Sequence, residues 1–224
     1  MIKVFGFIGE ITPGMQAAAD AADLVVGGRR HLDALGVPEV KRVVLGRIAP
    51  AIEAIQALDA ERNAVVIASG DPLFYGVVRR LRAAGLAVRV IPAVTSLQLA
   101  FAAVALPWDD ALLCSAHGND SAPALEAVRH HPKVGLLTDG KVGLPQIVEA
   151  SAGLGRWYVL AEHLGTDDER IRVLDETAAR QVGDITQPNV VLVLAHHPDD
   201  PAALGEQHAI SGARNPDGSL TDQR

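Results

Sequence analysis

The sequence predicts an α/β protein of two domains, each an α/β sheet with flanking helices. Short apolar runs alternate with helical patterns along most of the chain, as in βαβ units. This alternation is interrupted once, near residues 107 to 111. No segment of about 20 to 50 residues repeats, which argues against a solenoid. We therefore expect domains over 1–108 and 109–198, followed by a polar tail or linker over 199–224.

The first half is predicted to alternate strictly between strands and helices. The run "AVVIA" (64–68) is short, continuous and apolar, which is typical of strands buried in parallel sheets. Alanine-rich and periodic stretches favour helices from Pro13 and over 48–63. The run "LFYGVVRRLRAAG" (73–85) is expected to be a helix that ends at Gly85. The remaining strands are expected over 2–9, 23–27 and 86–92.

The second half is expected to repeat this alternation. It follows a helix from Thr95 or Ser96, either of which could cap it, and Pro107 is expected to close that helix. The apolar runs predict strands over 111–116, 133–139, 156–163 and 189–195, and helices over 124–131 and 144–153.

Composition and charge exclude several classes of protein. About half of the 224 residues are hydrophobic (49%), yet no apolar run reaches the roughly 18 residues that cross a membrane. The start of the chain lacks a signal-peptide pattern, so we expect a cytoplasmic protein. The single cysteine, Cys114, lies in an apolar run and is expected to be a core thiol. A net charge of −7 without a Lys/Arg tract does not favour nucleic-acid binding.

Metal and serine-hydrolase chemistry lack their usual patterns. The histidine pairs at 130–131 and 196–197 are adjacent in sequence and do not place two ligands on one helical face, so no metal site is expected. No G-x-S-x-G elbow occurs, which gives no support to a serine hydrolase.

Two glycine-containing loops follow predicted strands. "SGDP" (69–72) comes directly after the strand at 64–68, where ligands of open parallel sheets bind. Asp71 could accept hydrogen bonds from a ligand, or it could simply cap the next helix, as Asp often does. "GFIGE" (6–10) lacks the third glycine of a dinucleotide-binding loop, and by itself indicates only a tight strand-to-helix turn.

Several segments together resemble one known family. They are "VVGGRRHLDAL" (25–35), "ASGDPLFYG" (68–76), "VIPAVTSLQLAFAAVALPWDDALLCSAHG" (90–118), "LLTDG" (136–140) and "AEHLGTDDERI" (161–171). In order and spacing they resemble the tetrapyrrole methylase superfamily, and within it the precorrin carbon-5 methyltransferases of cobalamin biosynthesis. The likeness covers residues 1 to about 195.

The resemblance implies a fold, a cofactor and a binding site. The fold would be two α/β domains, usually in a homodimer, with S-adenosylmethionine in the cleft between them. Resemblance implies that the cofactor contacts Gly70, Asp71, Pro72, Leu73, Thr95 and Ser96 from the first domain, and Ala116, His117, Gly118, Leu137 and Thr138 from the second.

The resemblance also implies an anionic macrocyclic substrate. Tetrapyrroles of this kind carry many carboxylates, which arginine binds in a two-point geometry. Arg29 or Arg30 could grip one of them, or could be solvated without a partner, and Arg79 and Arg80 form a second basic pair. Many family members begin with a G-x-G-P-G loop that this chain lacks, so only Gly6 and Gly9 are carried over to the substrate side.

Methyl transfer depends mainly on positioning, and the sequence identifies no certain base. His117 and His31 are weak candidates for removing a proton, and each is individually more typical of a structural or binding residue.

Two other functions stay open: methylation of another tetrapyrrole carbon, and a non-catalytic tetrapyrrole-binding domain. The final segment "NPDGSLTDQR" faintly resembles the start of the carbon-15 methyltransferase fused to this domain in bifunctional relatives, so a fused or separate decarboxylating partner is possible.

Overall fold

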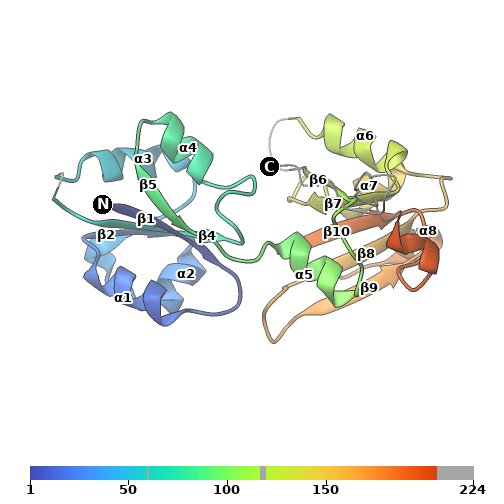
Figure 1. Cartoon of the computed structure of the whole chain (residues 1–224), viewed down its shortest axis with the longest axis horizontal. Helices are drawn as coiled ribbons and strands as arrows, with labels where there is room; N and C mark the ends of the chain where they lie inside the picture. Colours follow the sequence, from blue (N-terminus) through green and yellow to red (C-terminus); the bar gives the residue numbers. More distant parts are fainter. Residues whose placement is uncertain (60, 117–119, 206–224) are drawn as a thin grey trace, which may run out of the picture.

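The computed structural model describes residues 1–59, 61–116 and 120–205. Two lobes lie side by side, each built around one five-stranded sheet (Figure 1). The first lobe contains, in chain order, β1 (Ile2–Phe7), α1 (Pro13–Ala21), β2 (Leu24–Gly27), α2 (Arg29–Ala34), a 3-10 turn (Glu39–Lys41), β3 (Arg42–Val44), α3 (Ile48–Gln56), β4 (Ala64–Ser69), α4 (Val78–Ala83) and β5 (Val88–Ile91).

The first sheet is entirely parallel, with the strand order β3-β2-β4-β1-β5. Helices cover both faces, which explains why the central strand β4 is a continuous buried apolar run. One face packs against α1 and α2 through a cluster that includes Met15 and Leu32. The other face packs against α3 and α4 through Ile55 and Leu81.

The second lobe contains the remaining strands and helices. In chain order they are α5 (Ser96–Ala103), β6 (Leu112–Ser115), α6 (Ala122–His130), β7 (Lys133–Leu137), α7 (Leu144–Ala150), β8 (Trp157–Glu162), β9 (Arg170–Leu174), α8 (Glu176–Gln181), β10 (Asn189–Leu194) and a 3-10 turn (Pro201–Leu204).

The second sheet is mixed, with the order β6-β7-β10-β8-β9. Only β6 and β7 run parallel, and every other neighbouring pair is antiparallel. The sequence does not predict β9. The seven residues between β8 and β9 are too few for a parallel crossover, which needs about a dozen residues, so the chain turns back directly.

Helix α5 links the two lobes in sequence but belongs to the second lobe by packing. Its buried residues Leu97, Ala100 and Phe101 share a core cluster with β8 and β10. Helices α6, α7 and α8 cover the opposite face of that sheet. The division of the chain between residues 108 and 109 stays a prediction, and α5 lies before it.

The positions of most expected strands and helices are confirmed, but several helix boundaries are wrong. The helix expected over 48–63 already ends at Gln56. The expected helix over 73–85 begins only at Val78, because residues 73–76 form a turn in which Tyr75 has a φ of 51°. Pro107 does not close α5, which already ends at Ala103 before Ala105 takes a φ of 49°. Of the tail expected over 199–224, residues 199–205 are described and include the 3-10 turn Pro201–Leu204. Residues 206–224 lie outside the described residues.

Candidate functional site

The first lobe places its loops around a topological switch point. The neighbouring strands β1 and β4 lead to helices on opposite faces, since α1 lies on one face and α4 on the other. In open parallel sheets, ligands bind outside the carboxyl ends of strands at such a point. The loops that leave it begin after Phe7 and after Ser69, and they include the two glycine-containing loops of the sequence analysis.

The strand ends at this point meet so closely that side chains do not fit. The amide of Gly70 donates a hydrogen bond to the Phe7 carbonyl over 2.7 Å. A Cβ on Gly6 would lie 2.6 Å from the Gly70 carbonyl oxygen and 2.7 Å from Ala93. These contacts bring the carboxyl ends of β1, β4 and β5 together, and they require glycine at position 6.

The loop after β4 is shaped by Asp71, which does not cap α4. Its Oδ1 accepts a hydrogen bond from the Leu73 amide over 2.8 Å, and its carbonyl accepts one from Phe74. The cap position of α4 is Val77. The helix-cap interpretation of Asp71 is therefore wrong, because the chain makes a tight turn of its own before the helix begins. Pro72 is buried in this turn and Leu73 is 60% exposed.

Thr95 caps α5, as one of the two sequence-based alternatives predicts. Its hydroxyl accepts from the Gln98 amide over 3.1 Å, and the Gln98 side chain accepts from the Thr95 amide over 2.8 Å. This capping box fixes the start of the helix. A Cβ on Gly70 would lie 3.9 Å from the Ser96 amide nitrogen, so the loop after β4 faces the first turn of α5.

A basic cluster lies beside the same strand ends. Arg30, in the first turn of α2, donates from Nε to Nε2 of His31 over 3.1 Å and from Nη2 to the Ser69 hydroxyl over 3.1 Å. His31 is only 3% exposed and its ring lies 4.7 Å from that of Phe7. Burial, with a smaller contribution from the charge of Arg30, lowers the pKa of His31 to about 4. Arg29 is exposed.

In the second lobe, the predicted residues at the ends of β6 and β7 are adjacent. Ala116 is buried and donates its amide to the Leu137 carbonyl over 2.8 Å. The hydroxyl of Thr138 donates over 2.6 to 2.7 Å to oxygens of Asn189, at the start of β10, so it is engaged inside the protein. His117 and Gly118 lie outside the described residues. The exposed pair Arg79 and Arg80 lies on α4.

The loop after β1 touches the second lobe. Gly9 has a φ of 73°, and a Cβ placed there would lie 2.2 Å from the Gly165 carbonyl oxygen. Gly165 lies in the turn between β8 and β9, where its amide donates to Glu169 over 2.8 Å. The carboxyl ends of β7 and β8 lie at the same end of the second sheet, because both strands finish beside the first residues of β10. The loop after β1 and the turn after β8 therefore meet at this end of the second sheet.

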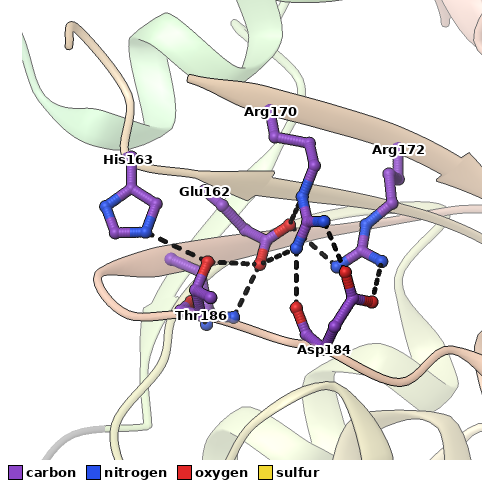
Figure 2. Close-up of polar contacts among 7 residues, drawn as sticks. Glu162, His163, Arg170, Arg172, Asp184 and Thr186 are labelled. Carbon is purple, nitrogen blue, oxygen red and sulfur yellow. Dashed lines mark hydrogen bonds and ion pairs between the residues drawn. The ribbon is translucent and has the colours of Figure 1, made fainter. Parts of the chain in front are cut away.

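A buried carboxylate that the sequence analysis missed anchors this turn (Figure 2). Glu162 ends β8 and is fully buried, and it accepts hydrogen bonds from two arginines of β9. Arg170 donates from Nε over 2.8 Å and Arg172 from Nη2 over 2.8 Å. The amide and hydroxyl of Thr186 also donate to Glu162, over 2.7 and 2.9 Å. Asp184 pairs with both arginines from the outer side.

The partners of Glu162 overcome the effect of burial. Burial by itself raises the pKa of this carboxyl, but the hydrogen bonds from Arg170, Thr186 and Arg172 lower it to about 2. Glu162 is therefore ionised at any working pH. The next residue, His163, has a φ of 51° and contacts the Thr186 hydroxyl through Nε2 over 3.0 Å. The only signal in the sequence was the run "AEHLGTDDERI", which does not reveal the contact with Thr186.

Within residues 1–59, 61–116 and 120–205, no three or more His, Cys, Asp or Glu side chains gather in a way that could hold a metal ion. No helix in the same residues is long and apolar enough to cross a bilayer. Cys114 is partly buried against the core between the second sheet and helices α6, α7 and α8, and burial raises the pKa of its thiol.

Comparison with known proteins gives close relatives in sequence. A cobalt-precorrin-7 C(5)-methyltransferase of Salmonella typhimurium is 33% identical over 189 residues, which cover 82% of this chain and 92% of that protein. A decarboxylating precorrin-6Y C(5,15)-methyltransferase of Sinorhizobium sp is 31% identical over 205 residues. That match covers 84% of this chain but 48% of the relative, which is about twice as long.

Solved structures share the fold. The precorrin-6Y methylase of Archaeoglobus fulgidus superposes with a TM-score of 0.64 at 25% identity, covering 87% of this chain and 97% of that one. A uroporphyrin-III C-methyltransferase of Thermus thermophilus superposes with a TM-score of 0.66 at 20% identity, and the match covers 92% of this chain and 97% of that one. The family model described as Tetrapyrrole (Corrin/Porphyrin) Methylases matches residues 6–179. The chain therefore belongs to the tetrapyrrole methylase family.

Proposed function

We propose that this chain is an S-adenosylmethionine-dependent methyltransferase that methylates carbon 5 of a precorrin macrocycle in cobalamin biosynthesis. The observation that carries the proposal is the 33% identity to a cobalt-precorrin-7 C(5)-methyltransferase, which extends over 92% of that protein. The switch point of the first sheet and the loops that meet there supply the site.

The residues of the first lobe fit a cofactor that approaches the backbone closely. Gly70 has a φ of 64° and leaves open space toward the Ser96 amide, which a side chain would fill. We place the cofactor against Gly70, Asp71, Pro72 and Leu73, with Thr95 and Ser96 beside it. The Asp71 carboxylate bonds within its own loop and the Thr95 hydroxyl caps α5. Both would therefore shape the site while backbone groups make the contacts.

The second lobe would supply the other wall. We propose that Ala116, His117 and Gly118, together with Leu137 and Thr138, contact the adenosine part. The Thr138 hydroxyl is already bonded to Asn189, so this residue would contribute its backbone. The turn at Gly165 holds this lobe against Gly9, which supports a site shared between the lobes.

Catalysis by this chain would consist chiefly of positioning. S-adenosylmethionine, when bound, would supply a methyl group on a sulfonium sulfur. The macrocycle carbon would take the methyl group as its bond to sulfur breaks, S-adenosylhomocysteine would leave, and a base would take the proton from that carbon. The two lobes would hold the carbon in line with the methyl group, an effect that can contribute about 7 to 11 kcal/mol. The buried Glu162 cluster supports this rigidity, because it fixes the base of the turn that meets the first lobe.

The substrate side of the site would lie at the loop after β1 and at α2. We propose that Gly6 and Gly9 let this loop approach the macrocycle and that Arg29 and Arg30 bind its carboxylates. His117 is retained as a candidate proton acceptor. His31 is a poor base at neutral pH, since it is buried and its pKa is about 4.

We extend the proposal to assembly and location. The resemblance supports a homodimer, and the single cysteine fits the reducing cytoplasm. The Sinorhizobium relative, named for both C(5) and C(15) methylation, suggests a fused or separate carbon-15 methyltransferase and decarboxylase as a partner.

Calorimetric titration with S-adenosylhomocysteine tests the cofactor site. The wild type should bind one equivalent, and Asp71→Ala should weaken binding about tenfold because the Leu73 amide loses its acceptor. Asp71→Asn keeps that acceptor and is the matched variant, which should bind nearly as well as the wild type. A folded wild type that does not bind would contradict the proposal.

Product analysis tests the reaction. Methyl-labelled S-adenosylmethionine and the macrocycle for which the Salmonella relative is named should give a product labelled at carbon 5, located by carbon NMR. Label at another carbon would identify a different methyltransferase of the family. Cofactor binding without any transfer would instead support a non-catalytic binding domain.

A further inference from the structure

The side chain of Arg30 is held by two neighbours at the carboxyl ends of the first sheet. Its Nε donates to His31 Nε2 and its Nη2 donates to the Ser69 hydroxyl, each over 3.1 Å. Ser69 is the last residue of β4 and directly precedes Gly70. This triangle of side chains therefore ties α2 to the loop that we propose for the cofactor.

The triangle requires an uncharged His31 with one particular tautomer. Nε2 accepts from Arg30, so it has no hydrogen and the hydrogen of the neutral ring lies on Nδ1. Ser69 Oγ lies 3.4 Å from the same Nε2 and already accepts from Arg30, so its own hydrogen can point toward the ring. Nδ1 is buried without a hydrogen-bond partner in the described structure. The hydrogen bond from Arg30 to Nε2 thus fixes the His31 tautomer, even though Nδ1 has no partner in the described structure.

The geometry leaves one edge of the guanidinium group available. An arginine has five N–H groups, and the contacts with His31 and Ser69 use the side-on edge formed by Nε and Nη2. The end-on edge, formed by Nη1 and the second hydrogen of Nη2, can bind both oxygens of a carboxylate. Arg30 itself is exposed, whereas His31 beneath it is 3% exposed.

We propose that His31 and Ser69 are positioning residues that hold Arg30 as a subsite for one peripheral carboxylate of the macrocycle. This inference rests on the proposed function and deepens it. Arg29, the adjacent exposed arginine, has no comparable support within the described residues, so the structure favours Arg30 over Arg29 for this role. His31 acts through Arg30, and a buried neutral imidazole suits this task better than it suits proton removal.

Binding of a stable corrin tests the subsite. The probe is cobyrinic acid, whose side chains end in carboxylates, and its heptamethyl ester serves as the uncharged counterpart. Fluorescence titration of wild type and Arg30→Gln should show about tenfold weaker binding of the acid by the variant. His31→Phe retains the ring packing on Phe7 but removes the acceptor, and it should lose a similar factor.

A double-mutant cycle separates positioning from a merely structural effect. In an Arg30→Gln background, His31→Phe should cause little further loss, because the residue that it positions is gone. His31→Gln, which restores an acceptor, should recover most of the binding, and Ser69→Ala should weaken it several-fold. Arg82→Gln, in the last turn of α4, is the matched exposed control and should bind like the wild type.

Titration with S-adenosylhomocysteine keeps this inference distinct from the proposed function. The variants at Arg30 and His31 should bind it like the wild type, which also shows that each of them folds. Failure of the wild type to bind it would contradict the proposed function. Where S-adenosylhomocysteine still binds, any of three results would overturn the subsite. They are that cobyrinic acid does not bind the wild type, that Arg30→Gln binds cobyrinic acid normally, or that His31→Phe weakens its binding equally with and without Arg30.

Discussion

Replacing the buried Glu162 by glutamine should destabilise the second lobe severely. The substitution preserves the size of the side chain but removes the charge that faces Arg170 and Arg172. Among the described residues, the carboxylate that would remain beside the two guanidinium groups is Asp184, which is largely exposed and lies on their outer side. Removing one partner of a buried ion pair typically costs about 3 to 5 kcal/mol.

The lowered pKa of Glu162 gives an independent magnitude. A folded-state pKa of about 2 compared with an ordinary value of 4.5 corresponds to about 3 kcal/mol, since one pKa unit equals about 1.4 kcal/mol. Because the folded pKa is the lower one, this stabilisation is present above about pH 4.5. It is lost as the pH falls from there toward 2 and the folded protein takes up the proton.

Urea unfolding measures this effect, followed by tryptophan fluorescence in a Trp108→Phe background. The signal then comes from Trp157 in β8, the strand that Glu162 ends. At pH 7, Glu162→Gln should lower the free energy of unfolding by about 3 kcal/mol. The matched control is Glu149→Gln, which removes an exposed partner of Arg180 and should cost less than about 1 kcal/mol. The difference between wild type and Glu162→Gln should shrink between about pH 4.5 and 2.

Equal costs for the buried and the exposed substitution would refute this reasoning. The burial of Glu162 and its hydrogen bonds would then contribute no more than a surface ion pair. A difference that stays constant from pH 7 down to pH 2 would refute the assignment of the lowered pKa to Glu162.

Two further substitutions or titrations probe the first lobe. Gly9→Ala should lower the free energy of unfolding by clearly more than Gly85→Ala, for which roughly 1 kcal/mol is expected. Both residues have positive φ, but of the two only Gly9 would place its Cβ against a backbone oxygen, that of Gly165, at 2.2 Å. Equal urea midpoints for the two variants would contradict the contact with Gly165. The His31 ring should titrate by NMR near pH 4, and stability should rise with pH between about 4 and 6.5, where only the unfolded chain binds that proton; a midpoint near 6.5 would show that the ring is solvated.

Local patterns in the sequence predicted most of the helices and strands. The apolar run of β4 is recognisable because a strand covered on both faces excludes polar residues. Thr95 and Gln98 lie three residues apart, so their capping box depends only on neighbouring backbone. The loop at 69–72 could also be located, because it follows such a strand directly. Its internal turn at Asp71 could not, because Asp accepts hydrogen bonds from turns and helix starts alike.

The site partly escaped prediction because its partners come from distant segments. Glu162 is bonded to Arg170, Arg172 and Thr186, and the last of these lies 24 residues away beyond another helix. A charged residue at the end of a strand is usually solvated, and nothing local indicates that this one is buried. The tether of Arg30 to Ser69 likewise spans 39 residues and exists only because β2 pairs with β4.

The sequence by itself determined where most strands and helices form and, through the family segments, what kind of reaction to expect of the chain. Only the tertiary structure decided the order of the strands, the mixed, mainly antiparallel second sheet and the packing of α5 in the second lobe. The physical reason is the range of the forces involved. Backbone conformation and capping respond to residues a few positions away, whereas strand order, burial and pKa depend on surfaces that meet after the chain has folded.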